Sequence, residues 1–164
     1  MSNPAVLISI RPVWVGKILS GEKTVEIRKR KPYFEPPFKC YIYCTKGREE
    51  KWLAGVKDGR ESYKLNGTVC AEFTCDSIKP IIPPFTEKEG TCLSPEQIKK
   101  YAGDWELWLH AWHISDVKVY DKPLIPGDFR YYACTDRVKT APQSFMYVNA
   151  STLGMKSFAS YSSI

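Results

Sequence analysis

The sequence lacks several features that would assign it to a special class of protein. Its amino terminus, MSNPAVLISIRP, has no basic segment followed by an extended apolar run, so it does not resemble a secretory signal. No segment approaches the roughly 18–20 consecutive apolar residues that a membrane-spanning helix requires. No internal repeat is evident either. We therefore expect a cytoplasmic protein without a membrane partner.

Metal-binding patterns are also scarce. The six cysteines include no C-x-x-C pair, and the two histidines, His110 and His113, have no third ligand nearby. Cysteines of a cytoplasmic protein stay reduced, and Cys40 and Cys44 alternate with neighbours as the residues of a buried strand face do. We expect structural cysteines, and neither a metal nor another cofactor.

The length and composition fit one globular domain. The chain has 164 residues, of which 43% are hydrophobic and 26% are charged, and single domains commonly contain about 100–200 residues. Lysine and arginine outnumber aspartate and glutamate by 24 to 18, which gives a formal charge of +6. This mild excess favours an anionic partner such as RNA, although a soluble protein can be basic for other reasons. We place one domain over residues 1–148 and a flexible tail over residues 149–164.

Short elements separated by prolines and glycines make up the expected fold. Apolar or alternating segments predict strands at residues 6–10, 24–30, 38–46, 68–82, 114–119 and 143–148. Pro12 begins a short helix that Gly21 ends. Ser94, Pro95 and Gln97 form the N-cap, first residue and capping-box partner of a second helix, which we expect to cover one end of a barrel. The fold class is therefore α+β, as a partly open mixed β-barrel with two or three short flanking helices.

The stretch from Gly21 to Lys31, GEKTVEIRKRK, carries the clearest chemical signal. Apolar Val25 and Ile27 alternate with polar residues, which predicts a strand with one buried and one exposed, charged face. Glu26 stands among basic side chains on that face, and Lys23 lies where the strand begins. Two interpretations remain open. The cluster is either solvated surface, where an ion pair contributes roughly 0–1 kcal/mol, or a site for an anionic or polar ligand.

Part of this stretch fits G-x-K-x-x-E-x-R, the signature of ASCH domains in the PUA-like superfamily, through Gly21, Lys23, Glu26 and Arg28. Residues 7–12 resemble the opening strand and helix start of that family, and residues 141–148 resemble the closing strand of members from phages and bacteria. The resemblance covers about residues 5–148. It implies a PUA-like, partly open barrel, a basic cleft beneath the signature turn, and a role in translation or RNA metabolism.

The first functional hypothesis is a binding module for RNA or for a modified nucleotide or nucleoside. Basic side chains would neutralise phosphate, Tyr43 or Trp14 would stack on a base, and other polar groups would contact base edges. The expected ligand-binding residues are Ser9, Arg11, Trp14, Lys23, Thr24, Glu26, Arg28, Arg30, Tyr43 and Thr45.

The alternative is a hydrolase that acts on nucleic acids or their components. Some ASCH proteins hydrolyse the acyl amide of 4-acetylcytidine with a lysine, a threonine and a glutamate, and others are described as ribonucleases. Lys23 matches the lysine, but Glu26 stands at the threonine position and no glutamate clearly matches the third group. In an enzyme, Lys23 and Glu26 would be the catalytic residues, although pairing with a carboxylate should hold the lysine protonated. A third hypothesis is regulation by contact with a protein partner, and nothing in the sequence specifies that partner or the oligomeric state.

Overall fold

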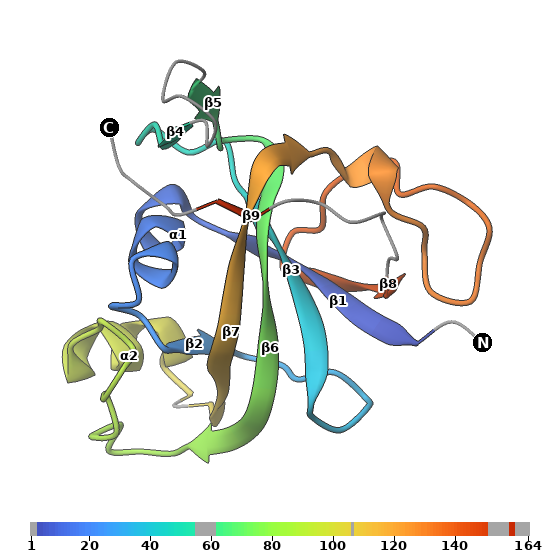
Figure 1. The fold of residues 1–164 in the computed structure, drawn as a ribbon. Coiled ribbons are helices and arrows are strands. Elements are labelled where there is room, and N and C mark those ends of the chain that lie inside the picture. The colour runs from blue at the N-terminus through green and yellow to red at the C-terminus, as the bar shows by residue number, and fades with distance from the viewer. Residues whose placement is uncertain (1–2, 55–61, 106, 151–157, 160–164) are drawn as a thin grey trace.

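A single curled β-sheet organises the protein, which Figure 1 shows as a computed structural model. Residues 3–54, 62–105, 107–150 and 158–159 are described. The sheet order is β2-β7-β6-β3-β1-β8, and β9 pairs with β7. These strands are β1 Pro4–Ile10, β2 Val25–Arg28, β3 Phe38–Cys44, β6 Thr68–Ile81, β7 Leu109–Leu124, β8 Phe145–Asn149 and β9 Phe158–Ala159. A separate two-stranded sheet contains β4 Trp52–Ala54 and β5 Ser62–Lys64, in the segment between β3 and β6.

The topology of the main sheet is mixed. β1 and β3 are parallel, because the chain passes through a helix and β2 between them, and the other pairs of the sheet are antiparallel. β2 and β8 stand at opposite ends of the strand order. The sheet is therefore not closed into a barrel, and the predicted partly open α+β fold is confirmed.

Two α-helices and one short 3₁₀-helix flank the sheet in the described part of the chain. They are α1 Pro12–Leu19, α2 Pro95–Ala102 and η1 Pro126–Asp128. At the start of α2, the backbone N–H of Gln97 donates to Ser94 Oγ at 3.1 Å, and the backbone N–H of Ser94 donates to Gln97 Oε1 at 2.8 Å. The predicted capping box is confirmed. None of the described helices is long and apolar enough to cross a membrane.

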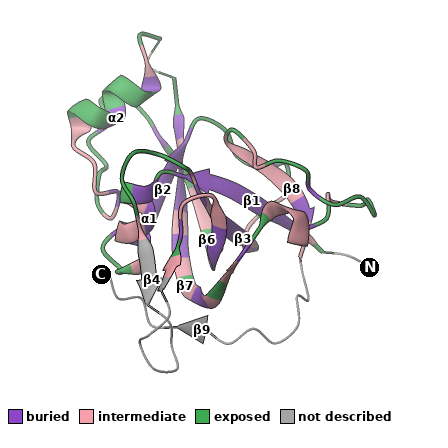
Figure 2. Cartoon of the chain, turned by 90° about the horizontal axis from the view of Figure 1, so that it is seen from above, coloured by how far each residue is buried: buried purple, intermediate pink, exposed green. Residues whose placement is uncertain are grey.

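Much of the main sheet is buried (Figure 2), and apolar side chains pack on both of its faces. On β3, Cys40, Ile42 and Cys44 pack in one cluster with α1, while Tyr41 packs in a second cluster on the opposite face. Cys70 and Cys75 are also buried, so the burial expected for most of the cysteines is confirmed. Within the described residues, no three side chains of the types that bind metals gather together.

A third apolar cluster joins α2 to the edge of the sheet. Ile98 and Ala102 of α2 pack in it with Val25 and Ile27 of β2 and with Leu109 of β7. The helix thus covers the apolar face of β2 and does more than close one end of the fold. This packing places the opposite, charged face of β2 toward the interior of the curled sheet.

One strand is much longer than the sequence indicates. The prediction of a strand at 114–119 is too short, because β7 extends over Leu109–Leu124 and pairs with both β2 and β6. Its irregular pairing with β6 includes several register shifts, which blur the alternation of apolar residues. Beyond β8, the strand β9 lies within the predicted tail; the remainder, residues 151–157 and 160–164, lies outside the described residues, so flexibility there stays a prediction.

Candidate functional site

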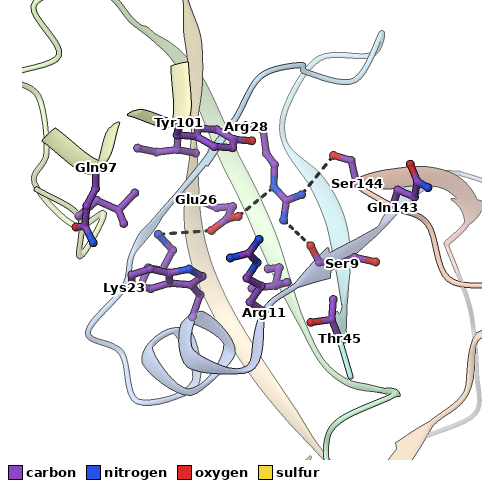
Figure 3. Close-up of a pocket in the computed structure, with 14 residues that line it drawn as sticks. Ser9, Arg11, Lys23, Glu26, Arg28, Thr45, Gln97, Tyr101, Gln143 and Ser144 are labelled. Carbon is purple, nitrogen blue, oxygen red and sulfur yellow. Dashed lines mark hydrogen bonds and ion pairs between the residues drawn. The ribbon is translucent and has the colours of Figure 1, made fainter. Parts of the chain in front are cut away.

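A cavity of about 460 Å³ opens beside the signature strand β2 (Figure 3). Its walls come from β1, α1, β2, α2 and the segment that leads into β8. Its volume lies in the range of about 300–1,000 Å³ that is typical of small-molecule sites. Most of the predicted ligand residues line it, namely Ser9, Arg11, Trp14, Lys23, Glu26, Arg28 and Thr45.

Glu26 lies at the centre of a buried network of charges. Its Oε1 accepts a hydrogen bond from Arg28 Nε at 3.0 Å, and its Oε2 lies 3.5 Å from Lys23 Nζ. Lys23, Glu26 and Arg28 are only 2%, 7% and 9% exposed. The interpretation of this cluster as solvated surface is therefore wrong, because α2 covers one face of β2 and the curled sheet encloses the other.

Arg28 also connects the two ends of the sheet. Its Nη2 donates to the backbone oxygen of Ser9 on β1 at 2.6 Å, and its Nη1 donates to Ser144 Oγ at 3.3 Å. Ser9 in turn donates through its Oγ to the backbone oxygen of Pro142 at 2.6 Å. A side chain from β2 thus bridges to β1 and to the segment before β8, at the other end of the strand order.

Lys23 is held by contacts on three sides. Its Nζ donates to the backbone oxygen of Thr91 at 2.7 Å, and it lies 5.2 Å from the centre of the Trp14 ring. Burial lowers the pKa of Lys23 below its ordinary value of 10.5, and this effect outweighs the opposing attraction of Glu26. An ion pair with Glu26 alone would raise the pKa of Lys23 and hold the lysine protonated, as the sequence predicts, so burial reverses the expected direction.

The loop before α2 positions this lysine. The backbone N–H groups of Thr24 and Val25 both donate to the Gly90 carbonyl, at 2.8 and 2.9 Å. Gly90 has a φ of +75°, and a Cβ at this position would lie 2.3 Å from Thr24 Oγ1. Since Thr91 follows directly, this close approach of two backbones places the carbonyl that accepts the hydrogen bond of Lys23.

Three predicted ligand residues lie elsewhere. Thr24 contacts Gly90 as described, and Arg30 is exposed beyond the end of β2. Tyr43 packs against the apolar cluster that contains Tyr41, because alternate side chains of β3 point to opposite faces of the sheet. Tyr43 is therefore not placed to stack on a ligand in this cavity.

Four polar residues line the cavity that the sequence pattern does not single out as ligand residues: Gln97, Tyr101, Gln143 and Ser144. Gln97 and Tyr101 are four residues apart and so share one side of α2. They are adjacent in sequence to Ile98 and Ala102, which pack on β2. The helical spacing could have grouped the first two residues, but it could not have placed them over β2.

The amide of Gln97 has a fixed orientation. Its Oε1 already accepts the hydrogen bond of the Ser94 backbone, so Nε2 is left to donate, and Figure 3 shows the nitrogen on the side that faces Lys23. Arg11 also lines the cavity, and its guanidinium has no hydrogen bond or ion pair within the described residues. Because both oxygens of Glu26 are engaged, the groups available to a ligand here are mainly donors.

Comparison with solved structures shows the class to which this fold belongs. The ASCH structure from Zymomonas mobilis superimposes with a TM-score of 0.62 and 20% identity, over 87% of this chain and 86% of that chain. Two mutant forms of the same protein give TM-scores of 0.62 and 0.60 with 19% and 18% identity, over 87% of this chain and 88% and 87% of theirs. Neither a protein-family model nor a curated protein sequence matches the chain.

The protein therefore has the fold of the ASCH domain. This is the family whose signature residues 21–28 resemble, so the resemblance is confirmed at the level of the fold.

The contact at Gly90 predicts a specific loss of stability. An alanine at position 90 would have a strained, left-handed backbone, and its Cβ would also collide with Thr24. We therefore expect Gly90→Ala to destabilise the protein by more than the backbone strain alone. Gly21→Ala is the matched control, because Gly21 has a φ of +84° and no atom within 4 Å of an added Cβ. We expect about 1–2 kcal/mol for the control and about 1–3 kcal/mol more for Gly90→Ala, measured by urea unfolding. Equal losses would show that the Gly90 contact relaxes freely.

The lowered pKa of Lys23 predicts how stability depends on pH. Between the folded-state pKa and 10.5, the unfolded chain retains a proton on this lysine that the folded chain has released. Stability rises with pH wherever the unfolded state binds more protons. We therefore expect the unfolding free energy of the wild type, relative to Lys23→Met, to increase as pH rises toward 10.5. Urea unfolding at several alkaline pH values measures this difference, and a falling difference would mean that Glu26 dominates.

Proposed function

We propose that the protein binds RNA or a modified nucleotide, with one nucleotide seated in the cavity. The main support for this proposal is the buried network of Lys23, Glu26 and Arg28 on the wall of an open cavity. Burial of charged groups removes them from water, and a buried ion pair often adds little stability relative to apolar packing. Such networks in clefts are characteristic of functional sites.

The charges of the site favour an anionic ligand. Two cations surround the single carboxylate of Glu26, so the network carries an excess of positive charge. Arg11 adds a further guanidinium at an exposed position. The planar fork of an arginine matches phosphate oxygens well, because it can donate two parallel hydrogen bonds. We therefore assign Arg11 to a phosphate group of the ligand.

The remaining walls suit a base. Trp14 and Tyr101 line the cavity from two different helices, and aromatic rings are common stacking partners of unpaired bases. Trp14 is one of the two residues predicted to stack on a base, and Tyr101 replaces the other, Tyr43. Gln97 presents an amide donor, which fits a carbonyl oxygen on the base. RNA binding is also what the resemblance to ASCH domains implies.

A hydrolase is the second candidate, and the environment of Lys23 favours it. Because burial lowers its pKa, this lysine holds a neutral amine over a wider range of pH than an exposed lysine does. A neutral amine beside a carboxylate can accept a proton from water or from a reacting group. Lys23 and Glu26 would then be the catalytic pair, acting on an acylated nucleoside or on RNA.

Binding of nucleotides by an Arg11→Ala variant tests the proposal. Arg11 is exposed, so its loss should leave stability unchanged while it removes a charged hydrogen bond worth about 1.5–3 kcal/mol. We expect at least a tenfold loss of affinity for uridine 5′-monophosphate, measured by calorimetry, and little change for uridine. Lys122→Ala is the control. It removes an exposed positive charge near the C-terminal end of β7, whereas the strand pairs with Arg28 of the cavity near its N-terminal end.

A second experiment separates the two candidates. Wild-type protein is incubated with short RNA oligonucleotides and with 4-acetylcytidine, and products are followed by mass spectrometry. Product that disappears in Lys23→Ala would establish the hydrolase. If the wild type neither binds nor changes any of these ligands, the assignment of the cavity is wrong.

Gln97 offers a sharper test of how the base is contacted. Gln97→Glu retains an oxygen that can accept the hydrogen bond of Ser94, so α2 keeps its capping box, but it replaces the Nε2 donor by an acceptor. We expect stability to stay within about 0.5 kcal/mol and affinity for uncharged uridine to fall about tenfold. Gln97→Ala, which removes both groups, should lose stability as well. Wild-type affinity in Gln97→Glu would exclude a contact between Gln97 and the base.

A further inference from the structure

Aromatic side chains are exposed next to the cavity, where the chain passes from α2 to β7. Trp105 and Trp108 are 89% and 63% exposed, and Tyr101 is 39% exposed. We call these three residues the aromatic surface. Clusters of large apolar side chains on a soluble protein usually mark a contact with a partner.

The aromatic surface is continuous with the cavity. Tyr101 belongs to both, since it also lines the cavity. Arg28 of the cavity pairs with His110 of β7, and Trp108 stands two residues before His110. Directly paired residues lie side by side, so the start of β7 lies beside the end of the strand that carries Arg28. Trp108 comes directly before β7 and is therefore near this end of β2.

Basic side chains lie among these aromatic rings. The chain continues from Arg28 as Lys29, Arg30 and Lys31, all three of them exposed. Lys29 Nζ lies 5.1 Å from the centre of the Tyr101 ring. Lys31 follows Arg28 by three residues, and Arg28 pairs with His110 of β7. Burial lowers the pKa of His110, and the positive charge of Lys31 adds to this effect.

This combination identifies the chemistry of the partner. A groove with positive charge and aromatic platforms is typical of proteins that bind single-stranded nucleic acid, in which phosphates contact the cations and bases stack on the rings. Binding surfaces complement the charge of their partners, so a run of basic residues beside the rings favours a polyanion over an uncharged apolar surface.

We propose that a single strand of RNA leaves the cavity across the aromatic surface. Tyr101 contacts the nucleotide in the cavity, the next nucleotide along the strand stacks on Trp108, and the phosphates between and beyond them contact Lys29, Arg30 and Lys31. This inference rests on the proposed function, since it takes the cavity as the seat of one nucleotide. It assigns the ligand as a polynucleotide of several units instead of a free nucleoside.

Comparison of uridine 5′-monophosphate with an oligouridylate of eight units tests this assignment. Each additional base that stacks on a ring adds affinity, so we expect the wild type to bind the oligomer at least tenfold more tightly than the monomer. Trp108→Ala should weaken binding of the oligomer about tenfold and leave binding of the monomer unchanged. Trp105→Ala is a second variant that tests the same surface. Ile125→Ala is the control, because Ile125 is an apolar residue with 58% exposure next to η1.

The outcomes separate this inference from the proposed function. If the monomer binds but the oligomer gains nothing, or if Trp105→Ala and Trp108→Ala both keep full affinity for the oligomer, the aromatic surface is not a path for RNA. If the oligomer binds through Trp108 while the monomer fails to bind, the aromatic surface is an RNA-binding site and the cavity is not a nucleotide site. Self-association that Trp108→Ala abolishes, without any effect on RNA, would overturn the inference and assign the surface to a second copy of this chain.

Discussion

The hydrogen bonds of Arg28 are the constraint on which this structure depends. The backbone pairing of the sheet ends at β2 on one side and at β8 on the other, and the guanidinium of Arg28 reaches across to Ser9 and Ser144. The same group donates to Glu26, whose other oxygen faces Lys23. One side chain therefore links the two ends of the open sheet and also orients the carboxylate in the cavity wall. A buried guanidinium requires such partners, because an uncompensated buried charge is strongly destabilising.

The site is held mainly by backbone groups. Carbonyl oxygens of Ser9 and Thr91 fix Arg28 and Lys23, and the carbonyl of Gly90 holds the start of β2. Backbone acceptors on packed elements move little, so the two cations are oriented before any ligand arrives. Burial acts on Lys23 in the opposite sense from Glu26, and the protonation of this amine is the chemical property that separates a binding module from a hydrolase.

Local chemistry could be predicted from the sequence, whereas its surroundings could not. The capping box of Ser94 and Gln97, the limits of α1 and the grouping of Lys23, Glu26 and Arg28 depend on neighbours in the chain, and the structure agrees with each. The burial of the charged face of β2 depends on the curl of the sheet and on α2, which are tertiary effects. Alternation predicts two faces for a strand, but it does not show which of two buried faces of β3 points to a cavity, so Tyr43 was assigned to the wrong one.

The capping box of α2 has a consequence that reaches beyond helix stability. The hydrogen bond from Ser94 to Gln97 Oε1 both starts the helix and turns the amide nitrogen toward the cavity. Fraying of the first turn of α2 would release the amide to rotate, and the cavity would then lose its preference between donor and acceptor atoms. Selectivity and local folding are thus linked thermodynamically, because a ligand that accepts a hydrogen bond from Gln97 also stabilises the first turn of α2.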